Sequence, residues 1–361
     1  MEFLPPPLDP DEQAVALGRW VTMPSAGLTG RSDPSIVWTR KAMIVWGGEA
    51  ESGVRGDGAS FDLATETWTP LPPAPFAPRR GHSAVWTGTT MLVYGGQGLS
   101  IECPQVCALG DGAAFDTIAN TWKPLAPAPL AARSGHTAVW VQNRMVVWGG
   151  AAEGGGALRD GASYDPATDT WTLLPPAPVT PRVGHRTVAT TNRMMVWGGA
   201  SQAADGSYFA DGAAYSPATN RWTLIAAAPG SLAARDSFAS VWTGGQMLVW
   251  GGPGRNDGAA YDPESDSWTV IGLSPLSGRT AAGAAWTGRD MLIWGGFDGA
   301  VQSDGAVYDP TRDVWARLAP GPLPPRQHQA MVWTGRQLLI WGGEGAEGKL
   351  ADGAVFTLSA R

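Results

Sequence analysis

The segment Met145-Val-Val-Trp148-Gly149-Gly150 decides the fold, because versions of it return along nearly the whole chain. An apolar run followed by two glycines indicates a buried strand that ends in a tight turn. The seven glycine pairs are Gly47-Gly48, Gly95-Gly96, Gly149-Gly150, Gly198-Gly199, Gly251-Gly252, Gly295-Gly296 and Gly342-Gly343. Successive pairs are 48, 54, 49, 53, 44 and 47 residues apart. A period of about 50 residues is typical of one four-stranded propeller blade.

Each repeat supplies three more strands around its glycine pair. Upstream lies a strand such as Ser83-Ala-Val-Trp86, followed by a short hairpin. Downstream, a loop of variable length leads to a phrase such as Asp160-Gly-Ala-Ser-Tyr164, which predicts a third strand. An Asp-Pro turn then leads to a fourth strand around a tryptophan such as Trp171.

Only six of the seven third strands are followed by a fourth strand, because the last repeat ends after its third strand. We expect the fourth strand of that repeat at the N-terminal end of the chain. Trp20 lies 11 residues before Arg31, the spacing that separates most later fourth-strand tryptophans from the next repeat arginine. We therefore predict an all-β fold, a seven-bladed β-propeller of four-stranded blades, closed by the N-terminal strand pairing with the C-terminal three strands. We assign residues 15–361 to this single domain and residues 1–14 to an N-terminal extension.

All 19 tryptophans fall on repeat positions, at the ends of first and second strands or inside fourth strands. Large aromatic side chains at fixed repeat positions are expected to fill the wedges between twisted blades. This regularity argues against a lectin, which would favour tryptophans at irregular loop positions.

The repeat resembles a known family. The run Pro181-Arg182-Val-Gly-His185, the glycine pairs, the phrase Tyr164-Asp165-Pro166 and the following Trp171 resemble kelch repeats, and Val-Trp-Thr-Gly resembles bacterial members. The resemblance extends from about Trp20 to Phe356. It implies the propeller fold and leaves the activity open, because kelch propellers include receptors, scaffolds and a few enzymes.

Net charge and hydropathy limit the classes of binding partner that we expect. The formal net charge of −7 disfavours nucleic acid, and the absence of a long apolar run disfavours membrane insertion. We expect a monomer. A disulfide between Cys103 and Cys107 would indicate an exported protein, periplasmic or extracellular, although the first residues do not form a signal peptide. Free thiols in a cytoplasmic protein are the alternative.

The loops between glycine pair and Asp-Gly-Ala contain 8, 14, 9, 11, 4, 7 and 8 residues, whereas the loops of the opposite face are nearly uniform. Binding residues concentrate on variable loops held by a rigid frame, so we place ligand binding on this face near blades four to six. The predicted ligand-binding residues are Arg182, Arg235, Arg279, Arg255, Tyr208, Phe209, Phe238 and Phe297.

Three of these residues belong to a ring of repeat arginines, namely Arg31, Arg79, Arg133, Arg182, Arg235, Arg279 and Arg326. The arginine fork suits carboxylate groups, and in kelch receptors for acidic peptides some matching arginines hold ligand carboxylates. The alternative is structural pairing with the seven Asp-Gly-Ala aspartates. His82, His136 and His185 share one repeat position and look structural, so we predict no metal and no cofactor.

Three functions remain open. The first is a non-catalytic module that binds a peptide or protein segment, or a small acidic ligand. The second is an enzyme for a sugar acid, as in kelch propellers that resemble this one and act as sialic acid mutarotases. Arg235 and Arg279 with Glu153, Asp205 or Asp298 would supply such a site, but no spacing singles out a catalytic residue. The third is a scaffold without a small ligand.

Overall fold

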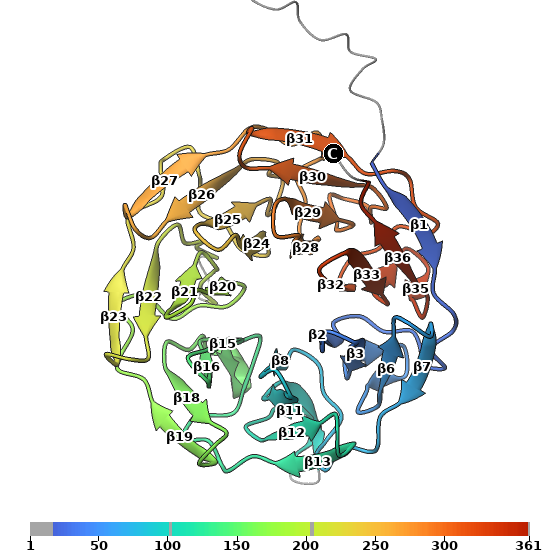
Figure 1. Cartoon of the computed structure of the whole chain (residues 1–361). Coiled ribbons are helices and arrows are strands. Elements are labelled where there is room, and N and C mark those ends of the chain that lie inside the picture. The colour runs from blue at the N-terminus through green and yellow to red at the C-terminus, as the bar shows by residue number, and fades with distance from the viewer. Residues whose placement is uncertain (1–16, 101–102, 203–205, 360–361) are drawn as a thin grey trace, which may run out of the picture.

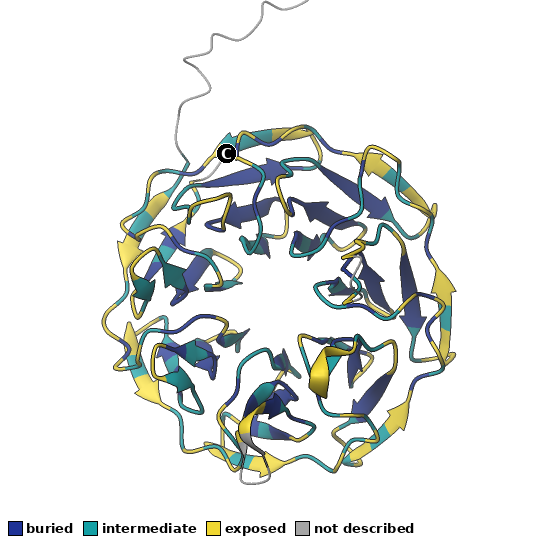
Figure 2. Ribbon diagram, turned by 180° about the vertical axis from the view of Figure 1, so that it is seen from behind, coloured by how far each residue is buried: buried dark blue, intermediate teal, exposed yellow. Residues whose placement is uncertain are grey.

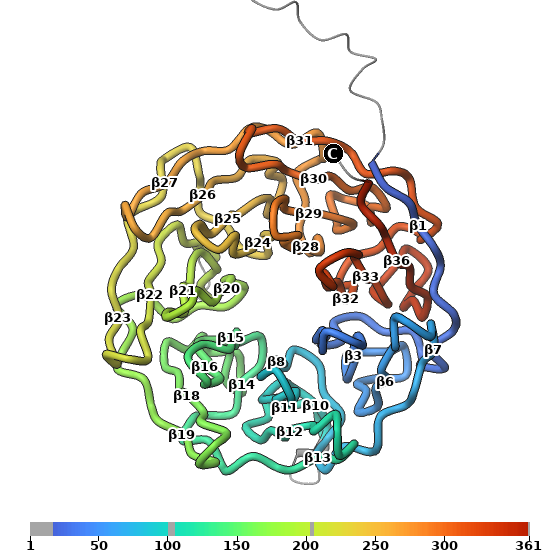
Figure 3. Tube along the Cα trace, viewed as in Figure 1, coloured from blue at the N-terminus to red at the C-terminus, as the bar shows by residue number. Residues whose placement is uncertain are grey.

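The computed structural model describes residues 17–100, 103–202 and 206–359, which form seven four-stranded antiparallel sheets arranged around one axis (Figures 1 and 3). This confirms the predicted all-β class, the number of blades and the strand order. Within these ranges the one helical segment is the short 3-10 helix η2 (Glu153–Gly155), and no helix is long and apolar enough to cross a membrane.

The two inner strands of each blade form the core. The first strands are β2 (Ser35–Trp38), β8 (Ser83–Trp86), β15 (Thr137–Val141), β20 (Arg186–Ala189), β24 (Ala239–Trp242), β28 (Gly283–Trp286) and β32 (Ala330–Trp333). The second strands are β3 (Ala42–Trp46), β9 (Thr90–Tyr94), β16 (Arg144–Trp148), β21 (Met194–Trp197), β25 (Met247–Trp250), β29 (Met291–Trp294) and β33 (Gln337–Trp341). The apolar residues of the second strands are almost wholly buried, because neighbouring blades cover both faces of each sheet.

The two outer strands complete each blade. The third strands are β6 (Gly58–Asp62), β12 (Gly112–Asp116), β18 (Gly161–Asp165), β22 (Gly212–Ser216), β26 (Gly258–Asp262), β30 (Gly305–Asp309) and β36 (Gly353–Thr357). The fourth strands are β7 (Thr67–Pro70), β13 (Thr121–Pro124), β19 (Thr170–Leu173), β23 (Arg221–Leu224), β27 (Ser267–Val270), β31 (Val314–Arg317) and β1 (Arg19–Thr22). These fourth strands form the exposed outer rim in Figure 2.

The predicted closure is confirmed. Strand β1 pairs antiparallel with β36, with Trp20 opposite Phe356, so the last blade takes one strand from each end of the chain (Figure 1). The Trp20 indole N–H donates to the Ala319 carbonyl at 2.8 Å, and its ring lies 5.9 Å from that of Trp294 in blade six. The closing blade therefore packs on its neighbour as the others do.

The fourth-strand tryptophans join neighbouring blades in all seven positions. Each indole N–H donates to a backbone carbonyl that follows the fourth strand of the preceding blade. Each ring also lies within 6.0 Å of the second-strand aromatic of that blade. The predicted role of these tryptophans as packing between blades is confirmed.

Blade packing explains the glycine pairs. Gly149 has a φ of 70°, in the left-handed region that side chains disfavour. A Cβ at this position would lie 2.7 Å from Cε1 of His185 in the next blade. The first glycine therefore turns the chain and leaves room for the neighbouring blade.

The two faces of the ring differ. The variable-loop face carries the connections between second and third strands and those between blades. Its loops add short strand pairs, namely β4 (Glu49–Ala50) with β5 (Gly53–Val54), β10 (Gln97–Ser100) with β11 (Cys103–Ala108), β14 (Arg133–Ser134) with β17 (Ala151–Ala152), and β34 (Glu344–Gly345) with β35 (Gly348–Lys349). The hairpin face carries the remaining connections within each blade.

Candidate functional site

The repeat arginines act as internal clamps. In blade three, the Arg133 guanidinium donates to the Gly149 and Asp160 carbonyls, each at 3.1 Å, and to the Asp160 carboxylate at 3.0 Å. Its Nε donates to the carbonyl two residues before it. All seven arginines are buried, and each forms an ion pair with the Asp-Gly-Ala aspartate of its own blade. The structural pairing that the sequence left open is therefore what the structure shows.

This pairing corrects part of the predicted site. Arg182, Arg235 and Arg279 are buried and engaged with Asp211, Asp257 and Asp304. Their guanidinium groups therefore offer no exposed donor to a ligand. The reason is physical, since a buried guanidinium needs a carboxylate and carbonyl oxygens around it, and each blade supplies both.

The second correction concerns Phe238, which is only 1% exposed. It occupies the repeat position of His82, His136 and His185 and packs edge-on against Trp197, with the ring centroids 5.1 Å apart. The histidines pack in the same way on second-strand aromatics of the preceding blades. Burial lowers the pKa of each of these three histidines to about 3, so they are neutral core residues.

Three predicted aromatic residues do reach the variable-loop face. Tyr208 is 48% exposed and Phe297 is 39% exposed. Phe209 is half-buried, and its ring lies over the Arg182 guanidinium at 4.4 Å. The arginine clamp of blade four thus supports an aromatic side chain of the loop above it.

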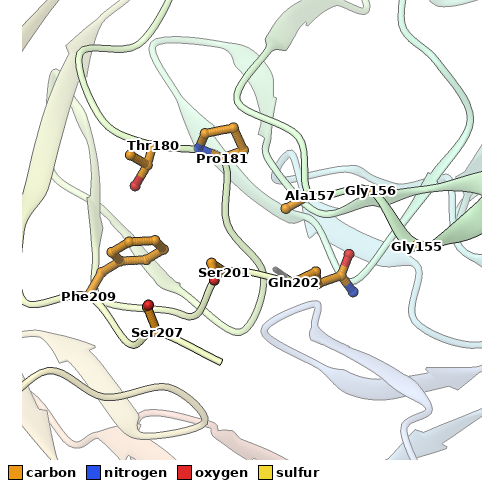
Figure 4. Close-up of a pocket in the computed structure, with 9 residues that line it drawn as sticks. All are labelled: Gly155, Gly156, Ala157, Thr180, Pro181, Ser201, Gln202, Ser207 and Phe209. Atoms are coloured by element: carbon orange, nitrogen blue, oxygen red, sulfur yellow. The ribbon is translucent and has the colours of Figure 1, made fainter. Parts of the chain in front are cut away.

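A pocket of about 420 Å³ opens beside Phe209, between the loops of blades three and four (Figure 4). Gly156 and Ala157 form one wall, and Thr180 and Pro181 lie next to Phe209 on the other. It lies one blade earlier than the groove predicted over blades four to six. The pocket is formed by the long loops of blades three and four. The short loop of blade five, on which the predicted groove was centred, does not contribute to it.

The inner rim of this face is a ring of backbone hydrogen bonds between blades. We define the inner rim as the residues two positions after each repeat arginine, namely Asp33, Gly81, Gly135, Gly184, Ser237, Ala281 and His328. All seven have positive φ, and five of them donate their N–H to the corresponding carbonyl of the preceding blade. At the closure, His328 Nδ1 lies 2.9 Å from an Asp33 carboxylate oxygen, which raises the pKa of His328.

Beside the inner rim lies Arg186, which the sequence-based prediction missed. It is the first residue of β20, whereas the other first strands begin with Ser, Thr, Ala or Gly. Its Nε donates to the Phe238 carbonyl at 2.7 Å, and within the described ranges no carboxylate lies at ion-pair distance. Burial lowers the pKa of Arg186 in spite of the attraction of Asp236 and Asp33, and burial raises the pKa of Asp236.

Two other arginines of this face also lack an ion-pair partner among the described residues. Arg159 precedes the Asp-Gly-Ala phrase of blade three and is exposed, and Arg255 lies half-buried in the short loop of blade five. Among the described side chains neither has an ion-pair partner, whereas Arg55, Arg80 and Arg317 on the same face are paired with Asp57, Glu49 and Asp304. Unpaired positive charge therefore occurs on three consecutive blades, three to five.

Two of the three carboxylates considered for an enzyme already have hydrogen-bond partners within the protein. Glu153 accepts the backbone N–H of Ala108 at 2.6 Å. Asp298 accepts hydrogen bonds from Ser277 and Gln302, and the Ser277 hydroxyl holds the pKa of Asp298 below its usual value. Asp205 lies outside the described residues.

The predicted disulfide lies partly outside the described structure. The backbone of Cys103 and Cys107 belongs to β11, and the buried Cys107 thiol lies 3.7 Å from the Gly98 carbonyl. The side chain of Cys103 is outside the described residues, so the disulfide stays a prediction.

Comparison with known families agrees with this architecture. A model of the KLHDC2/KLHL20/DRC7 Kelch-repeats domain matches residues 115–283, and a model of the Attractin/LZTR1 beta-propeller matches residues 15–160. The chain is a kelch-repeat β-propeller. A search of curated proteins found no match. Kelch propellers are typically protein-binding modules, which directs attention to the surfaces of this one.

Proposed function

We propose that this kelch propeller is a non-catalytic module that binds an acidic peptide segment on the variable-loop face of blades three to five. The observation that carries the proposal is the position of the unpaired arginines. Arg159 and Arg186 lie on blades three and four, which also carry Tyr208, Phe209 and the pocket beside them, and Arg255 lies on the adjacent blade five. Every clamp arginine on this face already has its carboxylate.

The chemistry of these groups suits a peptide with both acidic and apolar residues. A guanidinium without a protein carboxylate presents several N–H donors in a fork that matches a ligand carboxylate. Tyrosine and phenylalanine supply rigid contact area at low cost in conformational entropy. Arg186 contributes most to selectivity, because its Nε bond to Phe238 fixes its orientation.

The test begins with a phage-displayed random peptide library selected on the full chain. The enriched peptide is synthesised with a fluorophore, and its Kd is measured by anisotropy for the wild type, Arg186→Met and Tyr208→Ala. We expect an acidic consensus. Arg186→Met should lose about tenfold or more in affinity, since a charge-assisted hydrogen bond contributes about 1.5–3 kcal/mol, and Tyr208→Ala should lose about tenfold because it removes an aromatic contact. Binding to the wild type should weaken with added salt more than binding to Arg186→Met.

The matched control is Arg336→Ala, which removes an exposed arginine without a described partner from the hairpin face. This variant should bind like the wild type. A consensus without Asp or Glu, or equal affinities for the wild type and Arg186→Met, would refute the proposal.

One observation favours the sugar-acid enzyme as a second candidate. Asp236, whose pKa is raised by burial, lies near Arg186, and such a pair can combine a proton carrier with an anion-binding group. The test follows the exchange between sialic acid anomers by NMR with wild type and Asp236→Asn. Acceleration by the wild type that disappears in the variant would replace the binding module with this enzyme.

We also propose that the protein is exported, on the basis of the predicted Cys103–Cys107 disulfide. Mass spectrometry of the natively purified protein, alkylated without reduction, would detect the two thiols if the proposal were wrong.

A further inference from the structure

A second kind of site occurs on the hairpin face, away from the proposed peptide site. A cleft of about 930 Å³ lies between blades two and three. One side consists of the hairpin of blade two around Thr87, together with Thr121 of β13. The other side carries Trp140 of β15 and the hairpin residues Gln142 and Asn143 of blade three. The cleft therefore combines an aromatic ring with hydroxyl and amide groups.

The indole N–H distinguishes Trp140 from most other tryptophans. Every fourth-strand tryptophan donates its N–H to a backbone carbonyl, as do Trp148, Trp197 and Trp250 in second strands. Trp140 is half-buried, and its N–H makes no hydrogen bond within the described ranges and is not among the buried polar atoms that lack a partner. It thus remains a donor that is accessible to a ligand.

The cationic groups of the cleft are already paired within the protein. Lys123 pairs with Asp169 at 3.1 Å, and Arg144 pairs with Asp165 at 3.2 Å. Asp116 accepts the backbone N–H groups of the following turn and has no cationic partner among the described residues, so it remains a charged acceptor. In contrast, the side chains of Thr121, Gln142 and Asn143 are exposed and have no hydrogen-bond partner among the described residues. The open polar groups are therefore three neutral side chains and one carboxylate, which can accept a hydrogen bond from a hydroxyl group.

The regular tryptophan positions argue against a lectin, but the Trp140 N–H, which has no partner among the described residues, and the open polar groups around it are features of this cleft that the repeat pattern does not show. We propose that the cleft binds a neutral saccharide, with a sugar ring packed on Trp140 and its hydroxyl groups hydrogen-bonded to Thr121, Gln142 and Asn143. A pyranose ring has an apolar C–H face that matches an indole ring and an edge of hydroxyls that both donate and accept. An anionic ligand would be repelled by the Asp116 carboxylate and would have to compete with Asp169 and Asp165 for Lys123 and Arg144. An apolar peptide segment would leave the hydroxyl and amide groups without partners, which costs binding free energy.

The repeat places the same construction elsewhere on this face. The clefts between blades seven and one and between blades four and five measure about 600 and 290 Å³. They are lined by Trp38 and Trp242 at the position of Trp140 and by Thr334 and Thr190 at the position of Thr87, and they differ in the charged side chains beside them, such as Arg40 and Arg193. Such recurrence favours a ligand with repeating units, for which several weak sites act together.

The test uses saturation-transfer NMR on the full chain with four probes at millimolar concentration, namely cellotetraose, maltotetraose, mannotetraose and chitotetraose. We expect transfer to the C–H protons of at least one probe. For that probe, Trp140→Ala should raise the Kd about tenfold, and Trp140→Phe, which keeps a ring but loses the N–H, about threefold.

Trp140 also packs against the core between blades two and three, so its truncation carries a risk to folding. The double variant Thr121→Ala, Asn143→Gly removes open polar groups only, and Asn143 has a φ of 59° that glycine adopts freely. We expect this variant to weaken saccharide binding at least threefold with unchanged thermal stability.

Tyr208→Ala on the other face is the matched control and should bind the saccharide like the wild type, while Trp140→Phe should bind the selected peptide normally. The two proposals therefore fail independently. Absence of transfer to all four probes, or an unchanged Kd in both Trp140→Phe and the double variant, would overturn the saccharide site.

Discussion

At the residue scale, one arginine, one aspartate and one glycine carbonyl form a unit that recurs in every blade. The arginine ties the connection between blades to the loop between second and third strands. Because the arginine is buried and the aspartate is only half-buried, the aspartate is the residue whose removal leaves an uncompensated buried charge. In the sequence the arginine and the aspartate belong to separate motifs, and in the structure they form one ion pair.

This asymmetry predicts that Asp160→Ala lowers the free energy of unfolding by about 2–3 kcal/mol, although the Asp160 side chain is 49% exposed. Urea unfolding followed by tryptophan fluorescence measures the change. Lys41→Ala, which breaks an ion pair with an exposed lysine, should cost less than about 1 kcal/mol. Equal effects of the two substitutions would show that the clamp contributes no more than a surface ion pair.

At the element scale, closure depends on β1, a four-residue strand that meets the sheet only through β36. Its main anchor is Trp20, which packs on Phe356 with ring centroids 4.7 Å apart. Trp68 occupies the corresponding position in β7 of blade one. A short turn connects β7 to its sheet neighbour β6, whereas β1 and its neighbour β36 come from opposite ends of the chain. The two tryptophans therefore have similar contacts and different consequences for the integrity of the ring.

We predict that Trp20→Ala and Trp68→Ala each lower stability by about 3 kcal/mol, because both remove a large packed ring. Only Trp20→Ala should also cause self-association, since a detached β1 exposes the edge of β36 to other chains. Size-exclusion chromatography with light scattering measures the association. If both variants remained monomeric at the same concentration, β1 would not be the point at which the ring opens.

At the scale of the whole molecule, buried histidines in three blades link stability to pH. Burial lowers the pKa of His82, His136 and His185 to about 3, whereas an unfolded histidine titrates near pH 6.5. Between these values the unfolded chain binds more protons, so this stabilisation is complete above about pH 6.5 and falls as the pH decreases. His328 has the opposite sign, because Asp33 raises its pKa, so its contribution is lost as the pH rises through the folded pKa.

We therefore predict a fall in Tm as the pH decreases from 7 to 5, with each buried histidine contributing at most about 1.4 kcal/mol per pH unit. His185→Phe, which introduces the residue found at position 238, should make this dependence less steep by about a third. Differential scanning calorimetry at several pH values checks both statements. A slope that is identical in wild type and variant would mean that His185 is not held neutral.

The candidate site was only partly predictable, and Arg186 and Phe238 show why. Both break the repeat at positions that sequence comparison among blades reveals. The side chain of Phe238 points into the core, whereas Arg186 stands at the inner end of a first strand without an ion-pair partner among the described residues. A break in the repeat marks a position but not the direction of its side chain, because direction depends on how neighbouring blades pack.

The sequence by itself determined the fold class, the seven blades, the strand order and the closure. The glycine pairs and apolar runs recur about every 50 residues, and such a repeat buries its apolar residues only when equivalent sheets pack against each other. The tertiary structure alone decided which charges are free. Ion pairing and exposure depend on distances between segments that lie far apart in the chain. The same physical reason separates Trp140, whose N–H makes no hydrogen bond to any described residue, from the tryptophans whose N–H groups join one blade to the next.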